Sequence, residues 1–100
     1  MASQPLQFHP DARDEAFEAY DFYAQRSEDV GEAFLAELRA AGSAIQQSPQ
    51  SWASYLYGTR RYLLKRFPFV VVYRVAETRV EILAVAHGRR RPGYWQDRLS

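Results

Sequence analysis

The residues best suited to chemistry gather late in the sequence, in the run RVEILAVAHGRRRPGYW from Arg79 to Trp95. This run supplies a histidine, three consecutive arginines and two aromatic residues: His87, Arg89, Arg90, Arg91, Tyr94 and Trp95. Adjacent guanidinium groups repel one another and prefer to stay hydrated, so such a cluster adds little to the stability of a domain. The cluster has two interpretations. It is a surface that binds an anion or a partner's carboxylates, or it is a solvated strand end.

A second basic group precedes it in the run RRYLLKRF. If this run is a strand, alternation places Arg61 and Lys65 on one face and Arg60 and Arg66 on the other. A solvated edge strand would carry similar charges as protection against edge pairing, and that interpretation is slightly favoured for the run as a whole. The candidate target-binding residues are Arg61, Lys65, His87, Arg89, Arg90, Arg91 and Tyr94.

Aromatic residues accompany these cations, and the combination has two interpretations. Single-stranded RNA stacks its bases on aromatic rings and pairs its phosphates with arginine. Aromatic residues and arginine are equally typical of protein–protein hot spots. Composition does not decide between the two. Gly88 and the Pro92-Gly93 pair allow the chain to bend back, which favours Trp95 as a core or rim anchor and leaves Tyr94 open to either role.

Several classes of site are excluded by the residues present. There is no Gly-rich phosphate loop, and no nucleophile elbow surrounds a serine. His9 and His87 lie far apart without an HExxH pattern, and cysteine is absent, so neither a metal site nor a cofactor is expected. A helix-turn-helix interpretation of the N-terminal half fails because acidic helices are repelled by phosphate.

The elements that must position the cluster follow from periodicity. Two helices are predicted in the N-terminal half, the first with Asp11 as its cap and the second ending at Ser48-Pro49. Apolar residues in each recur at helical spacing, and residues 25–29 read as a short loop between them. The two helices therefore form a hairpin that is apolar on one side and acidic on the other.

The rest of the chain has the period of strands. A short strand around Gln7-Phe8 precedes the helices, 51–58 is a loop, and later strands are expected at 60–67, 69–75 and 79–87. A helical turn is expected within 92–99. This order predicts an α+β fold, β-α-α-β-β-β, in which a two-helix hairpin packs on a small antiparallel sheet. One hundred residues without a linker indicate a single domain over 1–100.

The charge distribution concerns partners rather than fold. Residues 1–37 contain nine acidic and two basic residues, whereas 38–100 contain three acidic and eleven basic ones. Twelve of the thirteen basic residues are arginine, which favours bidentate contacts to phosphate or carboxylate. The absence of cysteine, of an apolar stretch long enough to span a membrane and of a secretory pattern predicts a cytoplasmic protein without membrane contact.

The segments RRYLLKRFPFVVVYRV and VEILAVAHGRRRPGYW, following a helix hairpin, resemble the RelE/ParE superfamily of toxins from type II toxin–antitoxin pairs. The resemblance covers nearly the whole chain and implies a small bacterial cytoplasmic protein, a plasmid-stabilisation module and a tightly bound antitoxin. It also implies a toxin–antitoxin hetero-oligomer. RelE-like members cut messenger RNA in the ribosome without a metal, using basic residues and often a C-terminal tyrosine. ParE-like members lack that set and resemble DNA gyrase poisons.

Arg90 and Tyr94 stand where the RelE-like C-terminal arginine and tyrosine would be, but Val70 or Val71 occupies the stretch that carries another RelE-like arginine. Loss of one group aimed at a developing charge costs roughly 10²–10³ in rate. The departure favours the ParE-like branch and a gyrase inhibitor. The first alternative is a metal-independent, ribosome-dependent ribonuclease with catalytic Arg90, Tyr94, His87 and Lys65. The second alternative is an inactive antitoxin-binding module.

Overall fold

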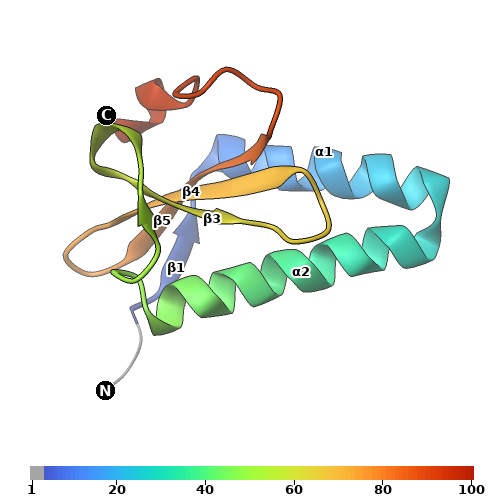
Figure 1. Cartoon of the computed structure of the whole chain (residues 1–100), viewed down its shortest axis with the longest axis horizontal. Helices are drawn as coiled ribbons and strands as arrows, with labels where there is room; N and C mark the ends of the chain where they lie inside the picture. Colours follow the sequence, from blue (N-terminus) through green and yellow to red (C-terminus); the bar gives the residue numbers. More distant parts are fainter. Residues whose placement is uncertain (1–3) are drawn as a thin grey trace.

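A computed structural model of the chain describes residues 4–100 (Figure 1). Its elements follow in the order β1 (Leu6–Phe8), α1 (Pro10–Arg26), α2 (Glu28–Gln47), β2 (Ala53–Ser54), β3 (Arg60–Leu63), β4 (Phe69–Val75) and β5 (Val80–His87), with short 3₁₀ turns at Leu56–Gly58 and Gln96–Leu99. The predicted α+β class and the helix hairpin on a sheet are confirmed. The predicted closing turn within 92–99 is also present.

The helix hairpin is tighter than the sequence predicts. Only Ser27 separates α1 from α2, in an extended conformation, so the expected loop over 25–29 is wrong. The first helix begins at Pro10, whose fixed φ suits the first helical position, and the side chain of His9 accepts a hydrogen bond from the Asp11 amide. The cap is therefore His9 and not Asp11.

A close contact between the helices makes this hairpin possible. Gly31 of α2 is buried against Ala24 of α1, and a Cβ at position 31 would lie 2.9 Å from the Ala24 Cβ. Real Cβ atoms do not approach one another so closely, so a side chain at position 31 would force the helices apart. Gly31 thus sets the distance between the two helices beside the turn.

The sheet is mixed and has the order β1-β5-β4-β3-β2. Pairing among β3, β4 and β5 is antiparallel, as predicted, and β2 pairs antiparallel with β3. By contrast, β1 pairs in parallel with β5, with Leu6 opposite Val80 and Phe8 opposite Ile82. The chain between the two strands, which includes the helix hairpin and then β2 to β4, supplies the crossover that a parallel pair requires. The short β2 lies inside the segment that was expected to be a loop.

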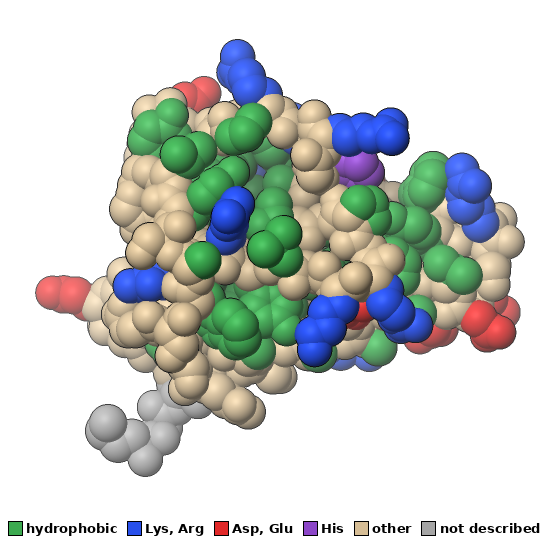
Figure 2. Space-filling model, in the orientation of Figure 1, with side chains coloured by type: hydrophobic (Ala, Val, Ile, Leu, Met, Phe, Trp, Pro, Cys, Tyr) green, Lys and Arg blue, Asp and Glu red, His purple; other side chains and the backbone are tan. Residues whose placement is uncertain are grey.

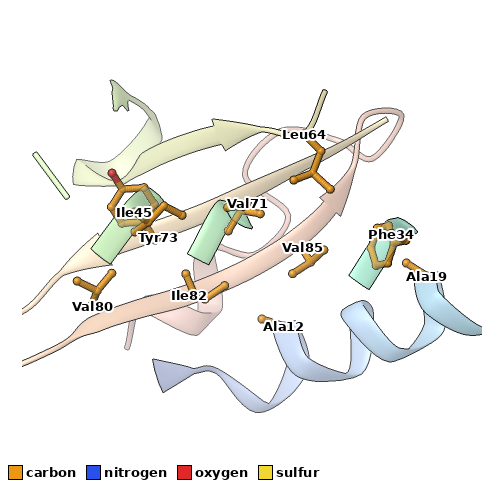
Figure 3. Packing of buried hydrophobic residues seen from close by; sticks show 11 residues of the cluster. Ala12, Ala19, Phe34, Ile45, Leu64, Val71, Tyr73, Val80, Ile82 and Val85 are labelled. Atoms are coloured by element: carbon orange, nitrogen blue, oxygen red, sulfur yellow. The ribbon is translucent and has the colours of Figure 1, made fainter. Parts of the chain in front are cut away.

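Both faces of the sheet are covered, and this explains the nearly continuous apolar sequence of β5. The helices cover one face, where Phe34 and Ile45 of α2 belong to the same buried cluster as Val71 and Val85 of the sheet, as Figure 3 shows. The C-terminal segment covers the other, where Trp95 packs on Val72, Ala84 and Ala86. Figure 1 shows α2 and the C-terminal segment on opposite sides of the sheet.

An irregularity in β5 determines how the C-terminal segment attaches. Tyr73 pairs with Ile82 and Val72 with Ala84, so Leu83 is the extra residue of a β-bulge. The bulge lies just past the end of β1, whose last ladder contact joins the His9 amide to the Ile82 carbonyl at 2.8 Å. Beyond that point the edge of β5 has no neighbouring strand among the described residues, and its backbone groups need other partners.

Candidate functional site

The open edge of β5 is closed by side chains from the two ends of the sequence. The Glu15 carboxylate of α1 accepts the Val85 amide at 3.0 Å, and the Arg98 guanidinium donates to the Leu83 carbonyl at 2.9 Å. Glu15 and Arg98 also bind each other through two bonds of 2.9 and 3.0 Å, with both side chains 13% exposed. The pair thus forms hydrogen bonds with backbone groups of β5 that a neighbouring strand would otherwise bond.

Tyr94 joins this pair through its hydroxyl, which donates to the Glu15 carboxylate at 2.6 Å. Burial raises the pKa of the Tyr94 hydroxyl, and the hydrogen bond to Glu15 raises it further. The Arg90 guanidinium lies over the Tyr94 ring, 3.7 Å from its centroid. Tyr94 is therefore a half-buried, protonated residue that carries Arg90 on one ring face.

Arg74 fixes the end of the same segment. Its Nε donates to the Glu81 carboxylate and its NH1 donates to the Leu99 carbonyl at 2.9 Å. The hydrogen bond from Arg74 lowers the pKa of Glu81 against the opposing effect of burial, and a hydrogen bond from Arg79 lowers it further. Strand β4 thus places Arg74 beside an acidic partner on β5.

A cleft of about 360 Å³ opens between the β3–β4 turn and the C-terminal segment. We call it the Arg61 cleft; it is lined by Arg61, His87, Arg90 and Arg91 and by apolar side chains that include Leu63, Val70 and Ala86. The Arg61 guanidinium lies over the Tyr55 ring, 4.8 Å from its centroid, and the Arg61 Nε is buried without a hydrogen-bond partner. Within residues 4–100 none of its three arginines forms an ion pair.

Figure 2 shows the surface charge that results. Lys and Arg side chains lie along the upper rim and across the middle of the viewed face, near a histidine and with hydrophobic side chains between them. Asp and Glu side chains lie mostly at the margins of the same face, and one is visible between two basic side chains in its lower middle. The arrangement suits a negatively charged ligand that also has apolar groups.

The structure separates the predicted site residues into two sets. Arg61, His87, Arg90, Arg91 and Tyr94 all line the Arg61 cleft. Arg89 is exposed outside it, with its amide donating to the His87 ring at 3.1 Å.

Lys65 is also outside this cleft. Since β3 ends at Leu63, the predicted alternation of Arg61 and Lys65 does not continue that far. The Lys65 and Arg66 amides instead donate to Glu37 of α2, which holds the β3–β4 turn. Lys65 lines a neighbouring hollow together with Trp52 and Tyr62.

Comparison with known proteins identifies the family. A model of the family described as the ParE toxin of type II toxin–antitoxin system, parDE, matches residues 6–92. The chain belongs to the ParE toxin family. The predicted resemblance, including its ParE-like branch, is confirmed.

Individual relatives agree with this membership. The chain is 29% identical to Toxin ParE2 of two Mycobacterium tuberculosis strains, over 96 residues that cover 95% of this chain and 91% of the relative. A solved structure titled Chromosomal ParDE TA system from P. aeruginosa has a similar fold, with a TM-score of 0.73 and 22% identity. The alignment covers 85% of this chain and 96% of that one.

Three residues that shape the site of this ParE-family chain were not found from sequence: Glu15, Arg98 and Tyr55. Glu15 carries a detectable signal, since it lies three residues after buried Ala12 and four before buried Ala19, on the core-facing side of α1. A carboxylate there requires a partner. Arg98 and Tyr55 carry no comparable signal.

Two further findings, for residues 4–100, concern metal binding and membrane spans. No group of three or more histidine, cysteine, aspartate or glutamate side chains is placed to hold a metal ion in this part of the chain. Neither α1 nor α2 is long and apolar enough to cross a membrane.

Proposed function

We propose that this ParE-family toxin inhibits DNA gyrase and is neutralised by a cognate antitoxin. The observation that carries the choice of gyrase is the engagement of Tyr94. A tyrosine that assists ribonucleolytic chemistry has to exchange its proton with the substrate. Here the Tyr94 hydroxyl donates to Glu15 at 2.6 Å, and burial together with that bond raises its pKa. Both features oppose a role as a general base.

The strand β4 supports the same choice. Val71 is 2% exposed in the helix-side core, and Val70 lines the apolar part of the Arg61 cleft. Neither valine supplies the cation that a cleaving site would aim at the developing negative charge. The cleft of this chain is therefore better suited to holding a partner than to cutting a phosphodiester.

The ribonuclease alternative has one observation in its favour. Arg61, His87 and Arg90 converge on a single cleft whose lining includes no carboxylate. Such a set could hold the scissile phosphate of messenger RNA on a ribosome, with His87 moving the proton in place of Tyr94. Lys65, which belonged to the predicted catalytic set, lines a different hollow and would not take part.

Two assays run on the same preparation separate these activities. We expect the purified toxin to inhibit gyrase supercoiling and to leave ribosome-bound messenger RNA intact. Replacing Arg90 by alanine should reduce inhibition, while Arg13→Ala, on the exposed side of α1, serves as the control with equal loss of charge. Ribosome-dependent cleavage with normal supercoiling would overturn the gyrase proposal. Absence of growth arrest on induction would favour the inactive antitoxin-binding module.

An antitoxin partner is supported by the family and by the solved neighbour, whose title names a ParDE toxin–antitoxin system. We expect an acidic, amphipathic antitoxin segment that lays apolar anchors on the toxin. A groove of about 390 Å³ between β1 and α2, lined by Leu6, Phe8 and Leu38, offers one apolar surface for such anchors. Co-expression with the product of the adjoining reading frame should give a stable hetero-oligomer on size-exclusion chromatography, and failure to co-purify would contradict this expectation.

A further inference from the structure

The Arg61 cleft has an unmet requirement for an anion. The Arg61 Nε is buried without a hydrogen-bond partner, although the rest of the guanidinium is held over the Tyr55 ring. Arg90 and Arg91 line the same cleft, and within residues 4–100 neither has a carboxylate partner. Arginines that share a cleft without a counter-charge are paired best by a charged acceptor. The cleft is therefore built to receive a negatively charged oxygen.

The aromatic rings of the cleft distinguish between classes of anion. A nucleic acid would stack its bases on free ring faces. Arg61 lies over the Tyr55 ring, Arg90 lies 3.7 Å from the centroid of the Tyr94 ring, and Trp95 is 1% exposed. These three rings thus already carry an arginine or are buried, so they offer little free face to a base. A carboxylate on a peptide needs no such face.

The apolar part of the cleft indicates what accompanies the carboxylate. Leu63 at the end of β3 is 63% exposed, and Val70 and Pro68 line the same cleft beside it. An exposed leucine beside uncompensated arginines suits a chain that alternates an apolar anchor with an acidic residue. This is the chemistry of an amphipathic acidic peptide.

We propose that the Arg61 cleft is the site where a segment of the antitoxin inserts one apolar side chain and, next to it, one carboxylate that pairs with the Arg61 guanidinium. The proposal rests on the proposed function for the existence of an antitoxin, and it adds the place and the contact. Arg90 and Arg91 hold the same acidic segment from the rim of the cleft. The surface that the toxin offers to its inhibitor then includes the C-terminal arginine cluster.

The first test measures the affinity of the toxin for the product of the adjoining reading frame by calorimetry. Removing one partner of a desolvated charge pair typically weakens binding by about 30-fold or more. We expect Arg61→Gln to weaken the complex by that factor and to flatten its dependence on salt. Arg13→Gln removes an equal charge from the exposed side of α1 and should leave affinity unchanged. Equal affinities for Arg61→Gln and wild type would refute the inference alone, whereas absence of any wild-type complex would refute the antitoxin proposal as well.

Two further measurements do not depend on the folding of Arg61→Gln. Leu63→Ser changes a side chain that is 63% exposed, so the fold should persist while the antitoxin binds more weakly. In ¹⁵N-labelled wild-type toxin, the Arg61 Nε–H resonance should shift on addition of the antitoxin. An oligouridylate probe should leave that resonance in place. A shift caused by oligouridylate but not by the antitoxin would assign the cleft to nucleic acid and overturn the inference.

Discussion

Replacing Glu15 by glutamine would leave the size of the side chain almost unchanged and remove its charge. The Glu15 carboxylate accepts two hydrogen bonds from Arg98, one from the Tyr94 hydroxyl and one from the Val85 amide. A glutamine oxygen can keep some of these bonds, but its amide group cannot accept, and Arg98 would lose its counter-charge. The variant therefore tests whether the pair that closes the edge of β5 stabilises the fold.

The expected effect follows from the burial of the pair. Both side chains are 13% exposed, so the free energy of unfolding should respond as for a buried pair and not a surface one. Breaking a buried pair by removing one partner costs about 3–5 kcal/mol, and the bonds that glutamine retains reduce this to about 2–4 kcal/mol. Tyr94→Phe removes one of the four bonds and should cost about 1–2 kcal/mol. Domains of this size unfold with about 5–15 kcal/mol, so both variants should remain folded.

Urea unfolding followed by tryptophan fluorescence gives the measurement, because Trp95 lies in the core that the C-terminal segment forms. Glu18→Gln is the matched control, since Glu18 is exposed on the same helix. If Glu15→Gln and Glu18→Gln had the same midpoint and the same slope with urea, the pair would contribute nothing and our reasoning would be refuted. In a double-mutant cycle with Arg98→Met, the stability lost in the double variant should be smaller than the sum of the two single losses.

Three other predictions concern packing and titration. Gly31→Ala should destabilise the fold by about 1–3 kcal/mol despite the higher helix propensity of alanine, because the new Cβ would lie 2.9 Å from the Ala24 Cβ; adding Ala24→Gly should restore part of the loss on thermal unfolding. Because Arg74 lowers the pKa of Glu81, this carboxylate stabilises the fold above its unfolded pKa and loses that contribution as the pH falls through the folded value, so Glu81→Gln should flatten the acid limb of stability against pH. The raised pKa of Tyr94 predicts that Tyr94→Phe removes a late-ionising group from the tyrosinate absorbance titration, and an unchanged late phase would contradict its assignment.

The spacing of apolar residues predicted the helices and strands well, because a helix or strand depends mainly on residues that are close together along the chain. The predicted strand over 69–75 coincides with β4, and the helical spacing of Phe34 and Ile45 does place them in the core. The parallel pairing of β1 could not be predicted in this way, because the period of a strand does not specify its partner. The five-residue loop was wrong because the close approach at Gly31 lets the helices meet across one residue.

The candidate site was predicted less completely, for a similar reason. Charge and composition identified Arg61, Arg90 and Arg91, which do meet at one cleft, whereas Arg89 lies outside it. Lys65 was grouped with Arg61 by strand alternation, but β3 ends before it and the backbone there turns toward Glu37. The role of Glu15 depends on a bulge in β5 and on a tail that returns to the sheet, and neither is encoded by spacing around Glu15 itself.

The bond between Glu15 and Arg98 joins residues that are 83 positions apart. During synthesis the helix hairpin emerges early, and its contacts across Ser27 are local, so it can begin to form on the nascent chain. Glu15 lacks this partner until Arg98 has been translated and has left the ribosome. The edge of β5 is closed only at that moment. We therefore expect the toxin surface around the C-terminal segment to mature late, and an early translation product to lack it altogether.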